Sequence, residues 1–165
     1  MIRTYRLEDK DYIVNSHYDL YNSEFGYDLS FRDFIEGSVS GFIERADAKE
    51  NIFILEIDEK QSGSVSIKKV SDTTAQLGLF LVEPNVRGTG YGQKLVEQAI
   101  TFSKDSGYKT IILWTNRELK SARRIYERAG FELKETQTQI LSNKELIEEK
   151  WELKLVGNEK MILFK

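Results

Sequence analysis

The residues with the clearest chemical pattern lie between Val82 and Gly92, a segment that reads VEPNVRGTGYG. A β-rich apolar stretch at 75–81 precedes it, and a stretch at 93–104 with apolar residues at helical spacing follows it. The glycines therefore lie on a predicted strand-to-helix turn. Glycine lets a ligand approach the backbone, and the free N–H groups at a helix start favour an anion, usually phosphate. Arg87 adds a positive charge at the edge of this turn, which therefore predicts a phosphate-binding site.

Two common phosphate-binding motifs do not fit this turn. The dinucleotide motif G-x-G-x-x-G is longer than the spacing of Gly88, Gly90 and Gly92, and the next predicted strand ends in Trp-Thr-Asn116 without the acid that this motif needs. The nucleotide P-loop requires Lys and then Ser or Thr directly after its last glycine, whereas Gln93 stands here. On these residues alone, a tight connection that binds no ligand is an alternative.

A second strand-to-helix unit follows. Residues 109–115 are typical of a buried strand, and residues 119–129 are typical of a helix that Gly130 ends. Tyr126 lies on the apolar face of this predicted helix, which ends in the pattern Tyr-Glu-x-x-Gly-Phe.

The first turn, Arg-x-x-Gly-x-Gly after Val-x-Pro, resembles the pyrophosphate-binding motif of the GNAT N-acetyltransferase superfamily, whose cosubstrate is acetyl-CoA. The Tyr-Glu-x-x-Gly-Phe pattern resembles a helix motif of the same superfamily. The chain is most similar to the acetyltransferase domains fused behind winged-helix regulators of the MarR type, in the runs 17–26, 113–116, 122–127 and 151–153. The resemblance covers about Ile2 to Leu155. It departs in two respects: no winged-helix domain precedes these runs, so DNA binding is not carried over, and 136–150 diverges in the region that often shapes the acceptor pocket.

The resemblance implies a cosubstrate site. The strand before the glycine turn would bind the pantetheine arm through its backbone, and the turn would bind the pyrophosphate. Asn116 would be a further contact for the arm, and Arg123 could reach a CoA phosphate, unless it is a solvent-facing charge that balances Glu127. The implied cofactor-binding residues are Phe80, Leu81, Val82, Arg87, Gly88, Thr89, Gly90, Tyr91, Gly92, Asn116 and Arg123.

The resemblance also suggests catalytic residues. Tyr126 is the candidate acid, since a phenol of pKa about 10 stays protonated at neutral pH and can donate to a thiolate whose conjugate pKa is about 8.5; the alternative is that it only fills the core. Some members carry a carboxylate where Gln76 stands here, so Glu83 is the nearest candidate base, with a solvated strand end as the alternative.

The acceptor is expected to bind beside the first helix. Tyr21 and Glu24 are the candidate substrate-binding residues, Glu24 as an anchor for the amine unless it is only a solvated helix end. His17, the single histidine, is expected to be a packing or helix-surface residue.

Composition limits the function further. The 165 residues are expected to form a single domain, 1–165, and the absence of cysteine excludes a disulfide, a thiolate metal site and an acetyl-enzyme thioester. A net charge of −3 argues against a nucleic-acid partner and mildly favours an amine. No metal-ligand cluster, membrane-spanning run or signal peptide is recognisable, so neither a metal nor a membrane partner is expected and the cytoplasm is the expected location.

The expected fold class is α/β, with the order β-α-α-β-β-β-α-β-α-β-β. The resemblance implies the GNAT fold, in which a mixed, mostly antiparallel sheet of about seven strands has helices on both faces. Ser30 with Asp33 predicts a capping box for the second helix, whose apolar face would include Phe34. The charged segment 144–150 predicts a surface turn of helix, and the apolar residues 161–164 predict a further strand, within the subunit or across a homodimer.

The expected function is an acetyl-CoA-dependent N-acetyltransferase that moves an acetyl group to a primary amine of a small molecule or peptide by direct attack. The alternative is a non-catalytic acyl-CoA-binding sensor or interaction module. Both require the turn at Arg87, but only the enzyme requires Tyr126 and an acceptor pocket.

Overall fold

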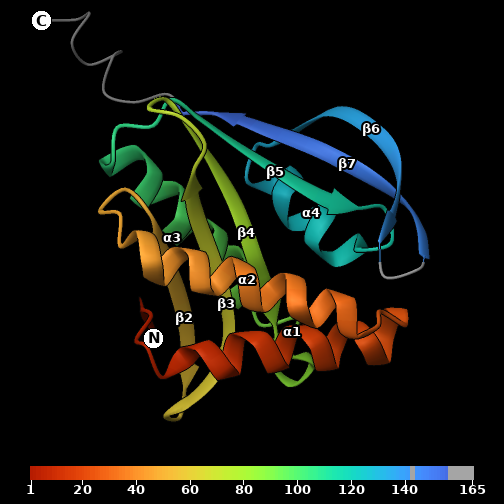
Figure 1. Cartoon of the computed structure of the whole chain (residues 1–165). Helices are drawn as coiled ribbons and strands as arrows, with labels where there is room; N and C mark the ends of the chain where they lie inside the picture. The colour runs from red at the N-terminus through yellow and green to blue at the C-terminus, as the bar shows by residue number, and fades with distance from the viewer. Residues whose placement is uncertain (142–143, 156–165) are drawn as a thin grey trace, which may run out of the picture.

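A seven-stranded mixed sheet forms the centre of the molecule (Figure 1). The structure is a computed structural model and describes residues 1–141 and 144–155. Along the chain the elements are β1 (Ile2–Thr4), α1 (Asp9–Phe25), α2 (Leu29–Arg45), β2 (Asn51–Ile57), β3 (Lys60–Lys69), β4 (Thr74–Val82), the 3-10 turn η1 (Pro84–Val86), α3 (Tyr91–Asp105), β5 (Thr110–Asn116), α4 (Lys120–Arg128), β6 (Glu132–Leu141) and β7 (Lys144–Lys154). The strand order is β1-β2-β3-β4-β5-β7-β6, and neighbouring strands are antiparallel except for β4 and β5. The predicted fold class is confirmed.

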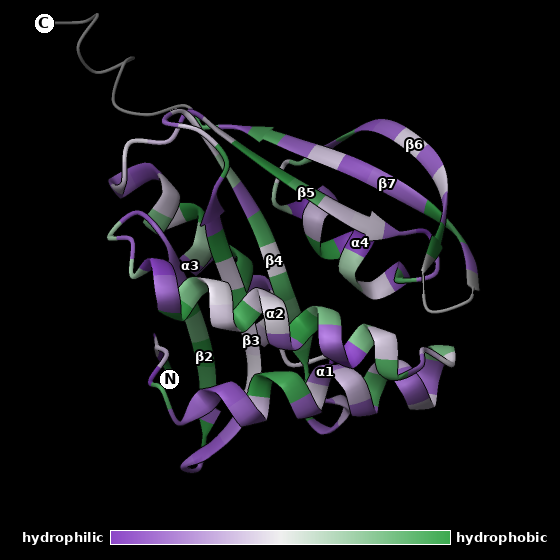
Figure 2. Cartoon of the chain, viewed as in Figure 1, coloured by the Kyte–Doolittle hydropathy of each residue, from purple (hydrophilic) through white to green (hydrophobic). Residues whose placement is uncertain are grey.

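Helices cover both faces of the sheet, as predicted. α1 and α2 lie on one face, where Ile13 and Val39 share a hydrophobic core with Ile52 of β2. α3 and α4 lie on the other face, where Leu95 and Tyr126 belong to a second core. In Figure 2 the hydrophobic colour follows much of β2, β4 and β5, whereas β6 and β7 are hydrophilic along most of their length. Within the described residues, no helix is long and apolar enough to cross a bilayer.

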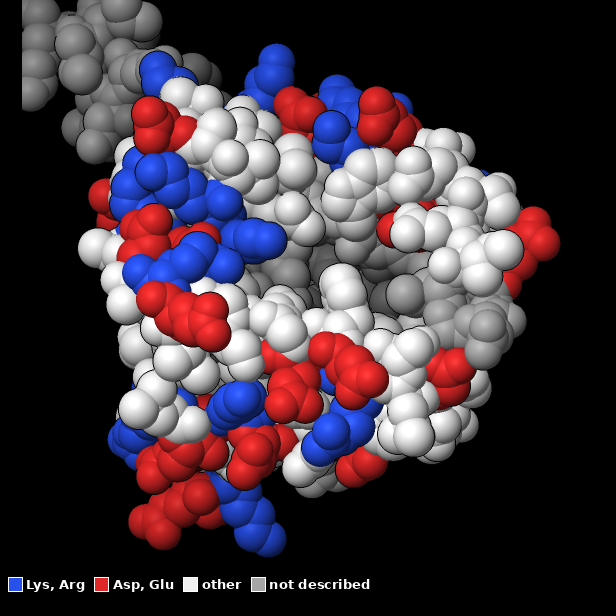
Figure 3. All heavy atoms as spheres, viewed as in Figure 1, with Lys and Arg blue, Asp and Glu red and all other residues white. Residues whose placement is uncertain are grey.

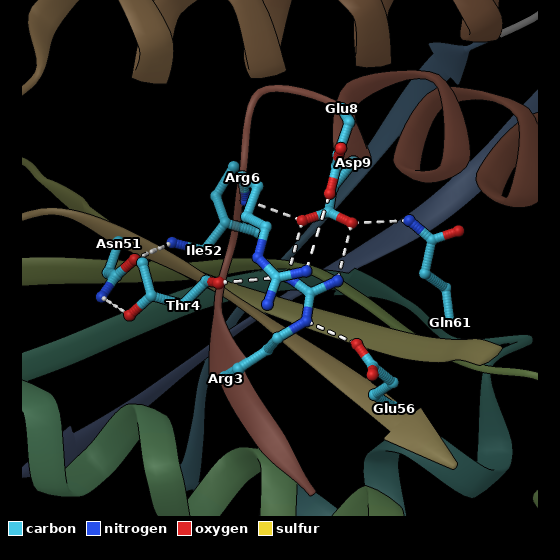
Figure 4. Close-up of polar contacts among 9 residues, drawn as sticks. All are labelled: Arg3, Thr4, Arg6, Glu8, Asp9, Asn51, Ile52, Glu56 and Gln61. Carbon is cyan, nitrogen blue, oxygen red and sulfur yellow. Dashed lines mark hydrogen bonds and ion pairs between the residues drawn. The ribbon is translucent and has the colours of Figure 1, made fainter. Parts of the chain in front are cut away.

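A buried carboxylate attaches the start of α1 to the sheet (Figure 4). Arg3 of β1 donates to the two oxygens of Asp9 at 2.8 and 2.9 Å, and its Nε donates to Glu56 of β2 at 2.6 Å. The backbone N–H of Arg6 and the side-chain amide of Gln61 donate to the same carboxylate of Asp9. Burial alone would raise the pKa of Asp9, but these hydrogen bonds, with that from Arg3 the largest, lower its pKa to about 2. The network holds α1 in place, and the other end of this helix lines the pocket described below.

β4 separates from β5 part-way along its length. The two strands pair only over 74–76 of β4, although β4 continues to Val82. Leu79 and Phe80 together oppose the single residue Val65 of β3, which is a β-bulge, and Leu79 has a left-handed φ of 45°. A non-glycine residue in this conformation costs about 1–3 kcal/mol. The bulge bends β4 and opens the sheet between β4 and β5.

α2 begins differently from the prediction. Asp28 caps this helix, because its carboxylate accepts the backbone N–H of Ser30 at 2.9 Å. The predicted capping box of Ser30 with Asp33 is therefore wrong: Asp28 is the residue in the extended N-cap conformation and already supplies the oxygen. Phe34 is also wrongly assigned to the apolar face, since it is 62% exposed, whereas Val39 is buried.

The charged segment 144–150 is a strand, so the predicted helical turn is wrong. It forms the first part of β7, which pairs with β5 on one side and with β6 on the other. The predicted strand at 131–140 is confirmed as β6, and the strand predicted from Lys150 begins earlier, at Lys144. Cross-strand pairing on both sides overrides the helical preference of these charged residues. The predicted strand at 161–164, with its homodimer contact, lies outside the described residues.

Candidate active site

The glycine turn exposes backbone groups between β4 and α3. Gly88 and Gly90 have left-handed φ values of 78° and 85°, and a Cβ atom at either would meet nothing within 4 Å. Gly90 is the N-cap of α3, and no side chain caps this helix. The Thr89 hydroxyl donates to the backbone oxygen of Val86 and so closes the turn. The first N–H groups of α3, which begins at Tyr91, are thus available to bind an anion.

A pocket of about 700 Å³ opens beside this turn. Its wall comes from the C-terminal part of α1, the end of β4, the glycine turn with the start of α3, and the segment from Glu118 into α4. This volume is within the range of about 300–1,000 Å³ that is typical of ligand sites. Of the residues that the sequence assigns to a site, those that line it are Tyr21, Glu24, Phe80, Leu81, Val82, Arg87, Gly88, Gly90 and Gly92.

Arg87 pairs with Glu24 of α1 at the wall of this pocket. Its two terminal nitrogens donate to the two carboxylate oxygens at 3.0 Å each, and its Nε donates to the backbone oxygen of Val82 at 3.4 Å. The hydrogen bond with Arg87 lowers the pKa of Glu24, and the same bond raises the pKa of Arg87. The sequence assigns these two residues to different ligands, a pyrophosphate and an amine. Since they bind each other, a phosphate at Arg87 has to compete with Glu24.

Tyr126 lies in the core between β4 and α4. It is 5% exposed, and its ring lies 5.8 Å from that of Phe80 and 5.9 Å from that of Phe131. Burial raises the pKa of its phenol, and Tyr21 of the pocket wall raises it further. Tyr126 therefore packs in the core beside Phe80 of the pocket wall and keeps its proton at neutral pH; it does not itself line the pocket, and its role as a donor stays a prediction.

Glu83, the candidate base, faces α1. Its carboxylate accepts a hydrogen bond from Tyr12 at 2.9 Å, and it does not line the pocket. His17 is 2% exposed, and its Nδ1 donates to the backbone oxygen of Ile13 at 2.8 Å. Burial lowers the pKa of His17 to about 4, so this residue is neutral at physiological pH.

Asn116 and Arg123 are both held by other side chains. Asn116 donates to the hydroxyl of Tyr27 at 2.5 Å. Arg123 donates to the two oxygens of the buried Glu149 at 2.7 and 3.1 Å. Neither lines the pocket, so the contacts with acetyl-CoA that the sequence suggests for them would have to compete with these bonds.

Some pocket residues were missed by the sequence reasoning. Gln93 lines the pocket directly after the glycine turn, and its buried Oε1 has no hydrogen-bond partner in the described part of the chain. Its position next to a predicted phosphate turn could have indicated it. Lys120, Ser121 and Arg128 line the pocket from α4. The positions of these three residues depend on how α4 packs against α3. The two helices are so close that a Cβ atom on Gly92 would lie only 2.8 Å from Ile125. Sequence spacing does not reveal this packing.

Comparison with known proteins identifies the family of the chain. The model of the acetyltransferase (GNAT) family matches residues 14–131. An uncharacterized N-acetyltransferase of Methanocaldococcus jannaschii is 32% identical over 93 residues, which are 53% of this chain and 41% of that relative. The chain thus spans less than half the length of the curated relatives that it matches.

Two solved structures illustrate the likeness in fold. A GNAT-family acetyltransferase of Staphylococcus aureus Mu50 has a TM-score of 0.78 at 17% identity, with 94% of this chain and 98% of that chain covered. A putative acetyltransferase of Salmonella typhimurium, solved with its cofactor acetyl-CoA, has a TM-score of 0.74 at 16% identity, with 94% and 93% covered.

Proposed function

The chain belongs to the acetyltransferase (GNAT) family, and we propose that it is an acetyl-CoA-dependent N-acetyltransferase that moves the acetyl group to a primary amine of a small molecule or peptide by direct attack. The observation that carries this proposal is that one pocket combines the glycine turn, the end of β4 and the α1 residues Tyr21 and Glu24. The glycine turn suits a phosphorylated cosubstrate, and the carboxylate of Glu24 suits a cationic acceptor.

The parts of acetyl-CoA match successive parts of the pocket. The N–H groups at the start of α3 would bind the pyrophosphate, where Gly88 and Gly90 leave the backbone open. Past residue 76, the edge of β4 that faces β5 has no strand partner in the described residues, so the amide-containing pantetheine arm can add to it as a strand would. Phe80, Leu81 and Val82 supply this edge at the pocket, and one of their N–H groups can polarise the thioester carbonyl.

Tyr126 is the proposed proton donor for the leaving sulfur. The acceptor nitrogen forms its bond to the acetyl carbon, and the bond from carbon to sulfur then breaks. A thiolate of conjugate pKa about 8.5 is a weaker base than the phenolate of Tyr126, whose pKa burial raises, so Tyr126 stabilises the leaving thiolate by donating a hydrogen bond to it. Sulfur receives a proton from Tyr126 only as the phenol oxygen takes up the proton that the acylated nitrogen loses, so Tyr126 ends the step protonated.

The acceptor must lose a proton before it can attack. Neutralising a lysine-like amine of pKa about 10.4 at pH 7 costs about 4.6 kcal/mol, whereas an α-amine of pKa about 7.8 costs about 1.1 kcal/mol. The carboxylate of Glu83 faces α1, where it already accepts a hydrogen bond from Tyr12, so without another base the site would favour the amine of lower pKa.

The proposal also covers the domain organisation, the relatives, the location and the partners of the protein. It includes a single domain over 1–165, a kinship with acetyltransferase domains fused to MarR-type regulators, and a cytoplasmic location without nucleic-acid or membrane partners. The net charge of −3 supports the absence of a nucleic-acid surface. In Figure 3 basic and acidic side chains are interspersed on the visible face, which supports the same view.

Two measurements test the proposal. Calorimetry measures acetyl-CoA binding, and a thiol-release assay screens polyamines, amino acids, aminoglycosides and peptides as acceptors. Binding together with turnover on an amine is the expected result. Binding without turnover would indicate the alternative, a non-catalytic acyl-CoA-binding module, and absence of binding would contradict both functions.

A further inference from the structure

One carboxylate of β7, Glu148, lies on the sheet face that α1 and α2 cover. Side chains alternate between the two faces along a strand. Glu149 points toward α4, where it pairs with Arg123, and Leu146 belongs to the core beneath α1 and α2. Glu148 is two residues from Leu146 and therefore shares its face.

The neighbours of Glu148 connect it to the pocket. It lies opposite Asn116 of β5 and Gln137 of β6, and side chains that are directly opposite in antiparallel strands lie about 5 Å apart on one face. Asn116 binds the hydroxyl of Tyr27, whose ring packs 5.3 Å from that of Tyr21 in the pocket wall. Figure 3 shows this face hollowed between α2 and the β5–β7 part of the sheet, with acidic atoms at the edge of the hollow. Glu148 itself does not line the pocket of about 700 Å³; it lies near the end of β5, where Asn116 and Tyr27 connect it to Tyr21 of the pocket wall.

Glu148 differs from the other carboxylates around the site in having no partner. Glu24 pairs with Arg87, Glu83 accepts from Tyr12, and Glu149 pairs with Arg123. Within residues 1–141 and 144–155, the carboxylate of Glu148 makes no ion pair and no side-chain hydrogen bond. Burial raises its pKa, which brings a carboxylate closer to the range where it can accept and release protons at neutral pH.

The groups that face Glu148 do not neutralise it. Tyr27 comes from the connection between α1 and α2, and its pKa is raised by burial and then by nearby acidic groups that include Glu118 and Glu148. Lys150, on the same face of β7, lies 4.0 Å from Glu135 of β6 and is directed to that carboxylate. The two opposite neighbours of Glu148 are neutral amides, so no cation of the described residues pairs with this carboxylate and a cationic ligand would supply one.

We propose that the acceptor site extends from the pocket past Tyr27 to Glu148, and that Glu148 binds the ammonium group of the acceptor and takes its proton, which makes the amine nucleophilic. This inference rests on the proposed N-acetyltransferase function. Glu148 takes one proton from the ammonium group and passes it to water. The bond from nitrogen to carbon then forms, the bond from carbon to sulfur breaks, and Tyr126 handles the second proton as described above. Glu148 thus supplies the proton-accepting group that the acceptor needs before it can attack.

Kinetics of four proteins test the assignment: the wild type, Glu148→Gln, Glu148→Asp and the control Glu152→Gln. Glu152 lies on the same strand and, by alternation, on the same face, but four residues further from the end of β5. Glu148→Gln should lower kcat by about 10²–10⁴-fold while acetyl-CoA affinity stays unchanged, and Glu148→Asp should restore part of the rate. Glu152→Gln should behave as the wild type. The part of the loss of kcat/KM at acidic pH that follows the protonation of Glu148 should disappear in Glu148→Gln, which a merely structural role would not produce.

A second measurement needs no known acceptor. Carbon-13 NMR of the Glu148 carboxyl in the folded wild type should give a pKa above that of an ordinary glutamate, and 1,4-diaminobutane should shift its signal. An ordinary pKa with no shift on adding the diamine would overturn the inference, as would unchanged kinetics of Glu148→Gln on an active acceptor. In that last case turnover by the wild type still supports the proposed function. A wild type that neither binds acetyl-CoA nor releases thiol would instead contradict the proposed function itself.

Discussion

Replacing Glu24 with glutamine should tighten the binding of acetyl-CoA and weaken the binding of a cationic acceptor. Glu24 occupies both terminal nitrogens of Arg87 at 3.0 Å, and these are the donors that a phosphate would use. Glutamine keeps the size of the side chain but removes its charge. The cosubstrate then no longer has to displace a carboxylate, whereas an ammonium group loses an anion in the pocket wall.

The expected size of the effect follows from the exposure of the pair. Its side chains are 42% and 33% exposed, so solvent screens their attraction, and exposed pairs contribute about 0–1 kcal/mol. The affinity for acetyl-CoA should therefore rise by up to about fivefold in Glu24→Gln. Arg87→Ala removes a charge-assisted contact of about 1.5–3 kcal/mol and should weaken acetyl-CoA binding by about 10- to 150-fold. Both effects should shrink as salt increases.

Calorimetry at low and high salt gives the acetyl-CoA affinity of each variant, and thiol release gives the KM of an active amine. A suitable control is Glu36→Gln, because Glu36 is also an exposed partner in an ion pair, lies on α2 and does not line the pocket. It should change neither value. If Glu24→Gln binds acetyl-CoA more weakly than the wild type, Glu24 helps to form the cosubstrate site. The idea that Glu24 competes with a phosphate for Arg87 is then refuted.

Three further changes give distinct outcomes. Gly90→Val should abolish acetyl-CoA binding by calorimetry and, because φ is 85°, lower the free energy of unfolding by about 1–2 kcal/mol; unchanged affinity would contradict the phosphate site. Tyr126→Phe should lower turnover by about 10²–10⁴-fold with acetyl-CoA affinity unchanged, and an equal rate with chemistry limiting would leave Tyr126 only a packing role. Asp9→Asn should destabilise the fold by about 2 kcal/mol at pH 7, as measured by urea unfolding. The pKa of Asp9 in the folded protein, about 2, lies below the ordinary 3.8, so the charged carboxylate stabilises the fold above pH 4 and this stabilisation is lost as the pH falls towards 2. The free energies of unfolding of the wild type and Asp9→Asn should therefore converge near pH 2. A difference that stays constant with pH would refute the role of the Asp9 charge.

The parts of the site that the sequence predicted are those that depend on local backbone geometry. Gly88 and Gly90 adopt left-handed φ values, and glycines at such spacing before an amphipathic helix indicate a turn without knowledge of the rest of the fold. The apolar spacing that includes Tyr126 also lies within a single helix. Such signals involve residues a few positions apart, so the order of strands and helices could be predicted from them.

The parts that were missed depend on contacts between distant segments. β7 carries Glu145, Glu148 and Glu149 among lysines, and such a sequence resembles a solvated helix until β5 and β6 pair with it on both sides. The pair of Glu24 with Arg87 joins residues 63 positions apart, and that of Arg123 with Glu149 joins residues 26 apart. No local spacing predicts these pairs, and they decide which of the candidate carboxylates can receive a ligand.

The two ends of α1 have different surroundings: its start is bound to the sheet, and its C-terminal part lines the pocket. Asp9, held by Arg3, lies at its start, and Tyr21 and Glu24 line the pocket near its other end. At 1.5 Å per residue, the helix places Asp9 and Glu24 about 22 Å apart. Since the Asp9 carboxylate has all its hydrogen bonds within the fold whereas Glu24 shares Arg87 with the proposed phosphate site, a ligand can act directly only on the second end. The Asp9 network therefore holds the proposed acceptor wall in a constant position, against which the proposed exchange of Arg87 between Glu24 and a phosphate would take place.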